Sequence, residues 1–227
     1  MFSGQYFYNK SLRKLVVGFG SLFTNIYVEH TNQNDEVNTQ IKVPITYAPQ
    51  EKFIRRLLEP SSIDNTTRIE NQLPRMSYIM TNIQADPSRR RNVNTPSLSR
   101  TTANCADDPL VITEEVPVSI GFTLFIYTRH IDDTLQIIEQ IIPYFNPQHI
   151  ITMDLNPAKP GVKIPITMVS NSIGERYDGD FSNRRVNISS FTFVAKSYIF
   201  GKVQSGTIID AVSVSGLTAG IAFGFDS

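Results

Sequence analysis

Hydrophobic and polar positions alternate most regularly in residues 111–128, near the middle of the chain. One set of alternating positions is apolar throughout and comprises Val118, Ile120, Phe122, Leu124 and Ile126. The intervening set begins with small or polar residues but ends with Phe125 and Tyr127, so the second half is apolar on both sides. This pattern is typical of a strand with neighbours on both edges and cover on both faces. We therefore predict a central strand over residues 111–128.

The segment that follows has the spacing of an amphipathic helix. Its predicted apolar stripe consists of Leu135, Ile138 and Ile142, with Ile137 and Ile141 beside them. We expect Asp132 or Asp133 to cap the helix, because a carboxylate accepts from unpaired N–H groups and suits the positive end of the helix dipole. Pro143 lacks an N–H and is expected to end the helix, with Tyr144 and Phe145 folded beneath it.

Periodicity elsewhere predicts two further helices and several strands. A helix capped by Ser11 has an apolar stripe made of Leu12, Leu15, Val16, Phe19, Leu22 and Phe23. A short helix is expected from Pro49, because proline suits the first helical turn. Strand patterns cover residues 25–47, read as a hairpin with a long loop, and residues 73–85, 150–155, 162–169 and 186–200. These elements predict an α+β fold with a mostly antiparallel or mixed central sheet, flanked by two or three helices, in a single domain over residues 1–200.

Two proline-containing strand segments are near copies of each other. Residues 41–46 read I-K-V-P-I-T and residues 162–167 read V-K-I-P-I-T. Pro44 and Pro165 cannot donate a hydrogen bond to a neighbouring strand, so each is expected at a sheet edge or a bulge. An edge is either protected or used for pairing with another chain. We favour pairing with another subunit over an internal duplication, because the sequences around the two segments do not repeat.

Residues 86–110 differ in composition from the rest of the chain. They are rich in Ser, Thr, Asn, Pro and Arg and lack periodicity, which predicts a long loop that is either mobile or ordered by a partner. Its charge cluster consists of Arg89, Arg90 and Arg91, with no aromatic residue between them to stack on a base. We therefore rank solvent exposure first, an acidic protein partner second and DNA third.

Both ends of the chain are expected to form arms. The N-terminal arm is aromatic, and its candidate contact residues are Tyr6, Phe7, Tyr8 and Asn9. It either packs on its own core or docks on a neighbouring subunit, where aromatic side chains supply much of the binding energy. Residues 201–227 carry glycines at four-residue spacing, as in membrane helix packing, but their apolar stretch falls short of a span of roughly 20 residues. We expect an extended C-terminal arm.

Composition and charge narrow the class of function. The chain has 227 residues with 21 basic and 21 acidic side chains, so its formal net charge is zero. A protein that depends on long-range attraction to nucleic acid or to an anionic membrane is usually more basic. The single cysteine, Cys105, excludes an internal disulfide and fits a reducing compartment. We expect no signal peptide, because Lys10, Arg13 and Lys14 interrupt the N-terminal region.

The histidines do not form a recognisable catalytic or metal-binding motif. His30, His130 and His149 are scattered and lack metal-ligand spacing. His130 lies beside two aspartates, but a triad built on it would lack a nucleophile elbow and a defined oxyanion donor. We expect no catalytic residue, no metal and no cofactor.

A charged loop precedes the last long strand. Asp178 and Asp180 flank a glycine, but the glutamate that completes a calcium-binding loop is absent. We interpret these carboxylates as part of a tight turn that pairs with Arg184, Arg185 or an arginine of a neighbouring subunit. Such a pair is worth about 0–1 kcal/mol when exposed, and at a desolvated interface it also fixes register.

Several motifs occur in a fixed order along the chain. The first half carries M-F-S-G-Q-Y-F-Y-N-K-S-L-R-K, G-S-L-F-T-N-I, I-K-V-P-I-T-Y-A-P-Q-E-K-F and I-E-N-Q-L-P-R, and the second carries I-Y-T-R-H-I-D-D-T-L-Q-I-I-E-Q-I-I-P-Y-F-N-P, Y-D-G-D-F-S-N-R-R and S-F-T-F. In these motifs the chain resembles the tail sheath stabilizer and completion proteins of T-even-type contractile-tailed bacteriophages. The resemblance covers roughly residues 1–85 and 117–200. It does not include the arginine-containing segment at residues 86–110 or the short apolar tail that begins at residue 201.

The resemblance implies a tail-terminator-like fold and a structural virion protein rather than an enzyme. Six copies would close into a ring at the head-proximal end of the tail. The ring would cap the tube terminator and the last sheath disc, hold the sheath extended and present a docking surface to the neck. DNA would pass through the lumen without sequence-specific binding, no membrane would be involved, and assembly would take place in the host cytoplasm.

The resemblance leads to a hypothesis about contact residues, and two other functions are considered beside it. We hypothesise that Arg129 and the charged loop lie near intersubunit or neck-facing contacts, because they occupy strand ends beside the central strand. The alternative function is a head-to-tail adaptor that lines the channel with direct DNA contacts. A hydrolase that depends on His130 ranks third.

Overall fold

The central strand predicted from alternation is the third of six strands in the main sheet. In the computed structural model, the order across this sheet is β3 (Ile45–Tyr47), β4 (Arg75–Ala85), β7 (Val116–Thr128), β10 (Val186–Ile199), β9 (Val162–Arg176) and β8 (His149–Met153). β3 and β4 are parallel, and every other pair of neighbours is antiparallel. The predicted α+β fold with a mixed, mostly antiparallel sheet is confirmed.

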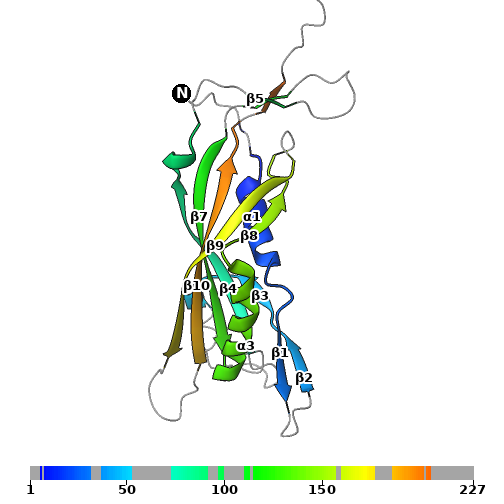
Figure 1. Ribbon diagram of the computed structural model, residues 1–227, viewed down its shortest axis with the longest axis vertical. Helices are drawn as coiled ribbons and strands as arrows, with labels where there is room; N and C mark the ends of the chain where they lie inside the picture. The colour runs from blue at the N-terminus through cyan, green and yellow to red at the C-terminus, as the bar shows by residue number, and fades with distance from the viewer. Residues whose placement is uncertain are drawn as a thin grey trace, which may run out of the picture.

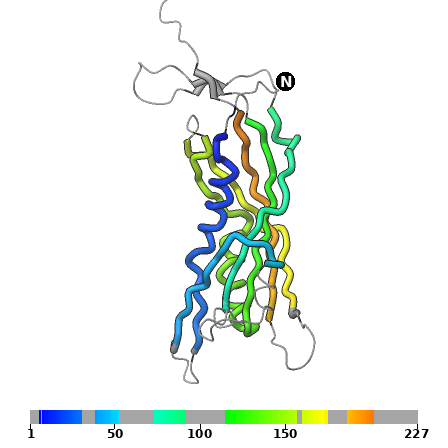
Figure 2. Tube along the Cα trace, turned by 180° about the vertical axis from the view of Figure 1, so that it is seen from behind, coloured from blue at the N-terminus to red at the C-terminus, as the bar shows by residue number. Residues whose placement is uncertain are grey.

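The structure describes residues 6, 8–31, 37–52, 73–91, 97–99, 110–112, 115–156, 160–176, 186–201 and 203–205. Within them, the helices α1 (Ser11–Ser21) and α3 (Ile131–Ile141) cover one face of the sheet, and the 3-10 turn η3 (Ile142–Phe145) follows α3. The start of α1 lies toward one end of an elongated body (Figures 1 and 2). The hairpin of β1 (Tyr27–Thr31) and β2 (Val37–Lys42) lies toward the other end.

An aromatic core fills the space between the helices and the sheet. Phe19 of α1 stacks on Phe122 of β7 with ring centroids 4.4 Å apart, and it meets Phe193 of β10 edge-on at 5.5 Å. Phe145 of η3 approaches Phe193 at 4.8 Å. Aromatic pairs of this kind add about 0.5–1.5 kcal/mol each beyond the burial of their area. The cluster therefore attaches α1 and η3 to the two central strands.

Helix α1 has the buried stripe that its sequence predicts, but not the predicted cap. Leu15, Phe19 and Phe23 are buried, and the other members of the stripe are half-buried. Ser11 is the first helical residue instead of the N-cap. Lys10 occupies the N-cap position in the left-handed region with φ 56°, and no side chain caps the helix there. Burial of the apolar stripe therefore stabilises α1 without a side-chain N-cap.

Helix α3 is present, but it is rotated from the predicted orientation. Its buried side chains are Asp133, Thr134, Ile137, Ile138 and Ile141. Leu135 and Ile142, both assigned to the buried stripe, are 45% and 37% exposed. The predicted aspartate cap is also wrong, because His130 is the N-cap residue and the two aspartates lie inside the first turn. After Pro143, Phe145 is buried as expected but Tyr144 remains exposed.

The predicted hairpin over residues 25–47 ends earlier than expected. β1 pairs with β2 up to Lys42, and the chain then leaves the hairpin at Pro44 to form β3, which joins the main sheet as an edge strand. The proline carbonyl accepts a hydrogen bond from the N–H of Met76 at 2.9 Å. The edge position expected for this proline is confirmed. The helix expected after Pro49 begins at Gln50, and its remaining part lies outside the described residues.

Pro165 does not lie at an outer edge. It is opposite Ile150 of β8, which covers that half of β9, and β9 pairs with β10 only from Ile166 onward. Pro165 is thus paired with a strand on its β8 side and has no paired residue in β10, as suits a residue that cannot donate to a second neighbour. The repeated hexads also differ in structure, because the first is divided between two sheets and the second is continuous within β9.

Part of the segment predicted as an irregular loop has regular structure. Residues 86–110 contain the 3-10 turn η2 (Pro87–Arg89) and the strand β5 (Ser97–Ser99). β5 pairs with β6 (Leu110–Ile112), which also pairs with β11 (Val203–Ser205) from the predicted C-terminal arm. The predicted continuous strand over residues 111–128 is accordingly divided into β6 and β7.

Candidate assembly surfaces

Two titratable side chains, His30 of β1 and Asp133 of α3, lie close together near the start of α3. Asp133 is almost fully buried, and its Oδ1 lies 3.7 Å from Nε2 of His30. Burial raises the pKa of Asp133, and the nearby His30 and His130 act in the opposite direction. Within the described ranges, no group of three or more His, Cys, Asp or Glu side chains is arranged to hold a metal ion. The pair has the geometry of a contact between the hairpin and α3.

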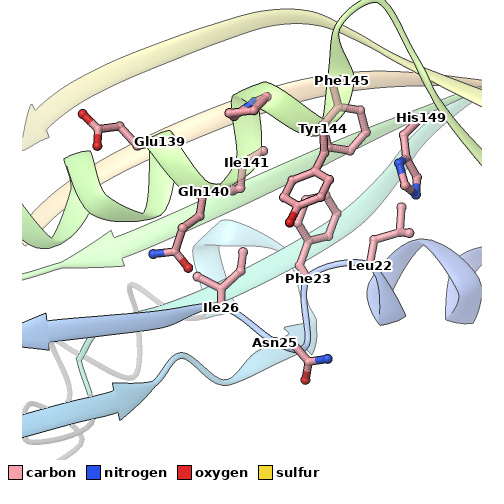
Figure 3. Close-up of a pocket in the computed structure, with 11 residues that line it drawn as sticks. Leu22, Phe23, Asn25, Ile26, Glu139, Gln140, Ile141, Tyr144, Phe145 and His149 are labelled. Carbon is pink, nitrogen blue, oxygen red and sulfur yellow. The ribbon is translucent and has the colours of Figure 1, made fainter.

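A pocket of about 560 Å³ lies between the end of α1 and the end of α3 (Figure 3). The rings of Phe23, Tyr144 and Phe145 group together in this view, and Leu22 and Ile26 add aliphatic surface. Polar residues at the pocket are Asn25, Glu139, Gln140 and His149. The amide of Gln140 is already used, because its Nε2 donates to the carbonyl oxygen of Tyr27 at 2.7 Å. The lining therefore suits an apolar or aromatic side chain.

Half of β9 forms an open edge of the main sheet. β8 covers β9 only up to Ile166, so among the described residues the outer side of residues 167–174 has no neighbouring strand. We call residues 167–174 the β9 edge segment. Its sequence, T-M-V-S-N-S-I-G, contains no charged residue and no proline. Val169 and Ile173 are 61% and 51% exposed, so this edge presents apolar side chains to solvent.

The opposite side of the sheet has a second open edge. β3 pairs with β4 only as far as Tyr78, so within the described part of the chain residues 79–85 have no strand on their outer side. We call residues 79–85 the β4 edge segment. Its sequence, I-M-T-N-I-Q-A, is also free of charge and proline, and Ile83 is 44% exposed. Neither segment contains a charged residue or a proline, which are two of the features that protect a sheet edge from pairing. Each segment does contain one register irregularity, between Met80 and Asn82 in β4 and between Met168 and Ser170 in β9.

The described part of the N-terminal arm is exposed at its tip and attached at its base. Tyr6 is 90% exposed and Tyr8 is 54% exposed, while Phe7 lies outside the described residues. Asn9 donates from Nδ2 to the carbonyl oxygens of Phe200 and Gly201 at 3.1 and 3.2 Å. The arm therefore leaves the body beside the end of β10.

The remaining predicted contact residues come from different elements of the fold. Pro44 is exposed between β2 and β3, Pro165 is half-buried within β9, and Arg129 is exposed just after β7. Four further predicted contact residues lie outside the described residues, namely Asp178, Asp180, Arg184 and Arg185. Pro44 and Pro165 therefore lie on opposite sides of the main sheet, and the grouping of the charged loop with them stays a prediction.

The arginine cluster separates into one anchored residue and two exposed ones. Arg89 donates from Nε to Oδ2 of Asp86 at 2.7 Å and from Nη2 to the carbonyl oxygen of Val118 at 3.1 Å. Its guanidinium carbon also lies 5.3 Å from the centroid of the Tyr198 ring. These contacts attach η2 to the main sheet. Arg90 and Arg91 are exposed.

The residues of the open edges were not among the sequence-based candidates. Val169, Ile173 and Ile83 are aliphatic, whereas the predicted contact residues are prolines, aromatic residues, an asparagine and charged residues. A signal was present in the sequence, since both segments are uncharged runs of seven or eight residues with β-branched residues and no proline. The topology was needed to show that these runs lie at edges.

The sequence of this chain is similar to those of phage tail proteins. The sequence profile of the T4-like virus Myoviridae tail sheath stabiliser family matches residues 6–219. The chain is also similar to the tail completion protein gp15 of Enterobacteria phage T4, with 32% identity over 208 residues, which covers 88% of this chain and 74% of that protein. Separately, no helix within the described ranges is both long and apolar enough to cross a membrane.

Proposed function

Because this chain belongs to the tail sheath stabiliser family of T4-like myoviruses, we propose that six copies of it form a ring that completes the head-proximal end of a contractile tail. The chain is a structural component of a phage tail. In the proposed ring, one face caps the tail tube and the last sheath disc and keeps the sheath extended. The other face provides the docking surface for the neck.

The open edges on both sides of the main sheet are the observation that best supports an assembly role. Among the described residues, nothing pairs with the β4 and β9 edge segments, and neither segment contains a charged residue or a proline. Such edges are templates for pairing with another chain. A subunit that joins its neighbours on two sides therefore suits this sheet better than a monomer does.

The partners of the ring follow from the same proposal. They are the tube terminator, the last sheath ring and the neck proteins, and the protein resides in the virion after assembly in the host cytoplasm. DNA passes through the lumen without sequence-specific contacts. The formal net charge of zero supports an inert channel wall, because counterion release by basic residues dominates the affinity of proteins for DNA.

The charged residues predicted as contacts remain part of the proposal. Arg129 is exposed at the end of β7, where a neighbouring copy or the neck can reach it. We expect Arg184→Glu combined with Arg185→Glu to weaken oligomer formation or tail binding. An unchanged oligomer and unchanged tail binding would reject the assignment of this loop.

Complementation of tails that lack this protein tests the function directly. Tails are assembled without the chain, purified, and incubated with or without it before storage and addition of filled heads. The proposal expects the protein to increase the fraction of extended sheaths in electron micrographs and the yield of infectious particles. Equal sheath extension and equal infectivity with and without the protein would reject it.

A further inference from the structure

We propose that neighbouring copies join edge to edge, with the β9 edge segment of one copy pairing with the β4 edge segment of the next. The main sheet would then continue from subunit to subunit around the ring. This inference rests on the proposed ring, and it specifies which surfaces close it.

The chemistry of the two segments favours strand pairing over a side-chain contact. Each is the open half of a long strand whose other half already pairs with a short outer strand. Backbone N–H and C=O groups at such an edge are satisfied by water or by another strand. The exposed Val169, Ile173 and Ile83 would gain apolar cover when the two edges meet.

Three other edges in the described part of the chain, those of β3, β8 and β1, are short or covered. β3 has three residues and follows Pro44, and β8 has five residues and follows Pro147. The edge of β1 is occupied by side-chain amides from Gln136 and Gln140 of α3. Short strands, prolines and covering side chains are the usual means of protecting an edge.

The direction of the strands suits a repeated contact. β4, β7, β10 and β9 are successively antiparallel, so β4 and β9 run in opposite directions within one copy. Copies that keep a common orientation around a ring would therefore place β9 of one antiparallel to β4 of the next. The contact joins two different surfaces, so it is heterologous and closes into a ring when the rotation between copies allows closure.

The two segments are also staggered along the strand direction. Through the registers of β7 and β10, Ile83 of β4 is level with Ile166 of β9, and Arg75 of β4 is level with Gly174. The β4 edge segment thus lies toward the end of the sheet that β8 covers on the other side. Strands in a closed sheet tilt and stagger in register. Copies related by rotation alone can pair these two segments if their strands are tilted to the ring axis.

Cysteine cross-linking between copies tests the pairing. Cys105 is first replaced by serine, and one cysteine is then introduced on each edge segment of the full-length chain. Asn171→Cys is combined in turn with Thr81→Cys, Ile83→Cys or Ala85→Cys, and the protein is treated with a short bis-maleimide, alone and on completed tails. We expect at least one combination to give a ladder of covalent bands that ends at six copies.

The single variants distinguish the geometries of contact. Asn171→Cys alone and Ile83→Cys alone should give no cross-link between copies, because the proposed contact joins different edges. Strong dimer formation by either single variant would show that like edges meet and would overturn the proposal. A covalent link from Asn171→Cys to a different tail protein, identified by mass spectrometry, would also overturn it.

Charge placed on an edge gives a second test with a matched control. Val169 of β9 and Val17 of α1 are almost equally exposed, at 61% and 62%. We expect Val169→Lys to reduce the six-copy assembly at least tenfold in native mass spectrometry, because a lysine has to be desolvated in the joined sheet. Val17→Lys should leave the assembly unchanged. Circular dichroism checks that both variants are folded, and equal assembly by the two would overturn the proposal.

The outcomes separate this inference from the proposed function. Six-copy rings that restore tails but give no cross-link in any combination would overturn edge pairing and leave the function intact. A chain that neither assembles on tails nor restores them would reject the function as well.

Discussion

The side-chain amide of Gln136 forms two hydrogen bonds with the backbone of Glu29. Its Nε2 donates to the carbonyl oxygen of Glu29 at 3.0 Å, and its Oε1 accepts from the N–H of the same residue at 2.9 Å. Gln140, one helical turn later, makes the same pair of bonds with Tyr27. Its Nε2 donates to the carbonyl oxygen at 2.7 Å, and its Oε1 accepts from the N–H at 3.3 Å. Four helical residues rise about 6 Å and two strand residues about 6.6 Å, so the two spacings match. Helix α3 thus takes the place of a further strand at the edge of β1.

Loss of this helix-to-strand pairing should loosen the hairpin. We expect Gln136→Ala to lower stability by about 0.5–1.5 kcal/mol, since water can replace the bonds of the partly exposed amide. Amide hydrogen exchange at Glu29 should become faster. Glu139→Ala, on the exposed side of the same helix, should change neither quantity. Equal exchange at Glu29 in the wild type and in Gln136→Ala would contradict the role of the amide.

Two glycines in α1 should respond differently to alanine. A Cβ at Gly20 would lie 2.6 Å from Cζ of Tyr78, whose hydroxyl donates to the carbonyl oxygen of Val16 at 3.1 Å. We expect Gly20→Ala to destabilise the fold by about 1–3 kcal/mol, despite a gain of about 1 kcal/mol in helix propensity.

Gly18 provides the matched comparison for Gly20. A Cβ there would meet the flexible end of Met153, at 2.6 Å from Cε, and this side chain can move aside. Gly18→Ala should therefore be close to neutral in thermal or denaturant unfolding. Similar losses of stability for both variants would contradict this account of the helix packing.

The sequence predicts the main sheet better than it predicts the orientation of α3 or the position of the open edges. Alternation over β7 identifies the central strand, because a buried face requires one apolar residue in every two. The pattern of α3 is ambiguous, since isoleucine or leucine occurs on most sides and the buried face contains Asp133 and Thr134. Contacts with β1 and β7 decide which side is buried, and these depend on tertiary structure.

The open edges could not be assigned from sequence for a related reason. An uncharged run such as residues 167–174 reads equally well as an inner strand. Among the described residues, β8 is too short to cover all of β9, and this leaves part of β9 open. The prolines indicate the outer strands but not the open segments, since Pro44 precedes the edge strand β3 and Pro165 lies in the half of β9 that β8 covers.

Arg89 should control the acidity of Asp86. The pKa of Asp86 is lowered to about 2, first by hydrogen bonds from Ser88 and then by the bond from Arg89. We expect Arg89→Ala to raise this pKa toward its ordinary value without fully restoring it, because the Ser88 bonds remain. Carboxyl NMR titration measures the change, and Arg90→Ala should have no effect. An unchanged pKa in Arg89→Ala would show that the ion pair does not persist in solution.

Tyr127 should make the fold sensitive to alkaline pH. Burial raises the pKa of its hydroxyl to about 12, and the hydrogen bond with Ser77, at 3.1 Å, acts in the opposite direction. In the unfolded chain a tyrosine hydroxyl ionises near pH 10. The stabilisation that arises from the protonated Tyr127 hydroxyl is therefore complete below pH 10 and is lost as pH rises from 10 to 12.

The Tyr127→Phe variant checks this alkaline sensitivity. It should lose about 1 kcal/mol at neutral pH, because the hydrogen bond is removed, and show a flatter decline between pH 10 and 12. The same change at the exposed Tyr144 should leave the profile as in the wild type. Denaturant unfolding across this pH range measures both, and a Tyr127→Phe profile parallel to the wild type would contradict the assignment.

If this chain completes the tail as a ring, the ring should be visible in images of finished tails. Electron cryo-microscopy of tails with and without the protein, averaged at the head-proximal end, counts and locates its copies. We expect a six-copy ring above the last sheath disc that is missing when the protein is absent. A different copy number, a different position on the tail, or identical ends in the two samples would contradict it.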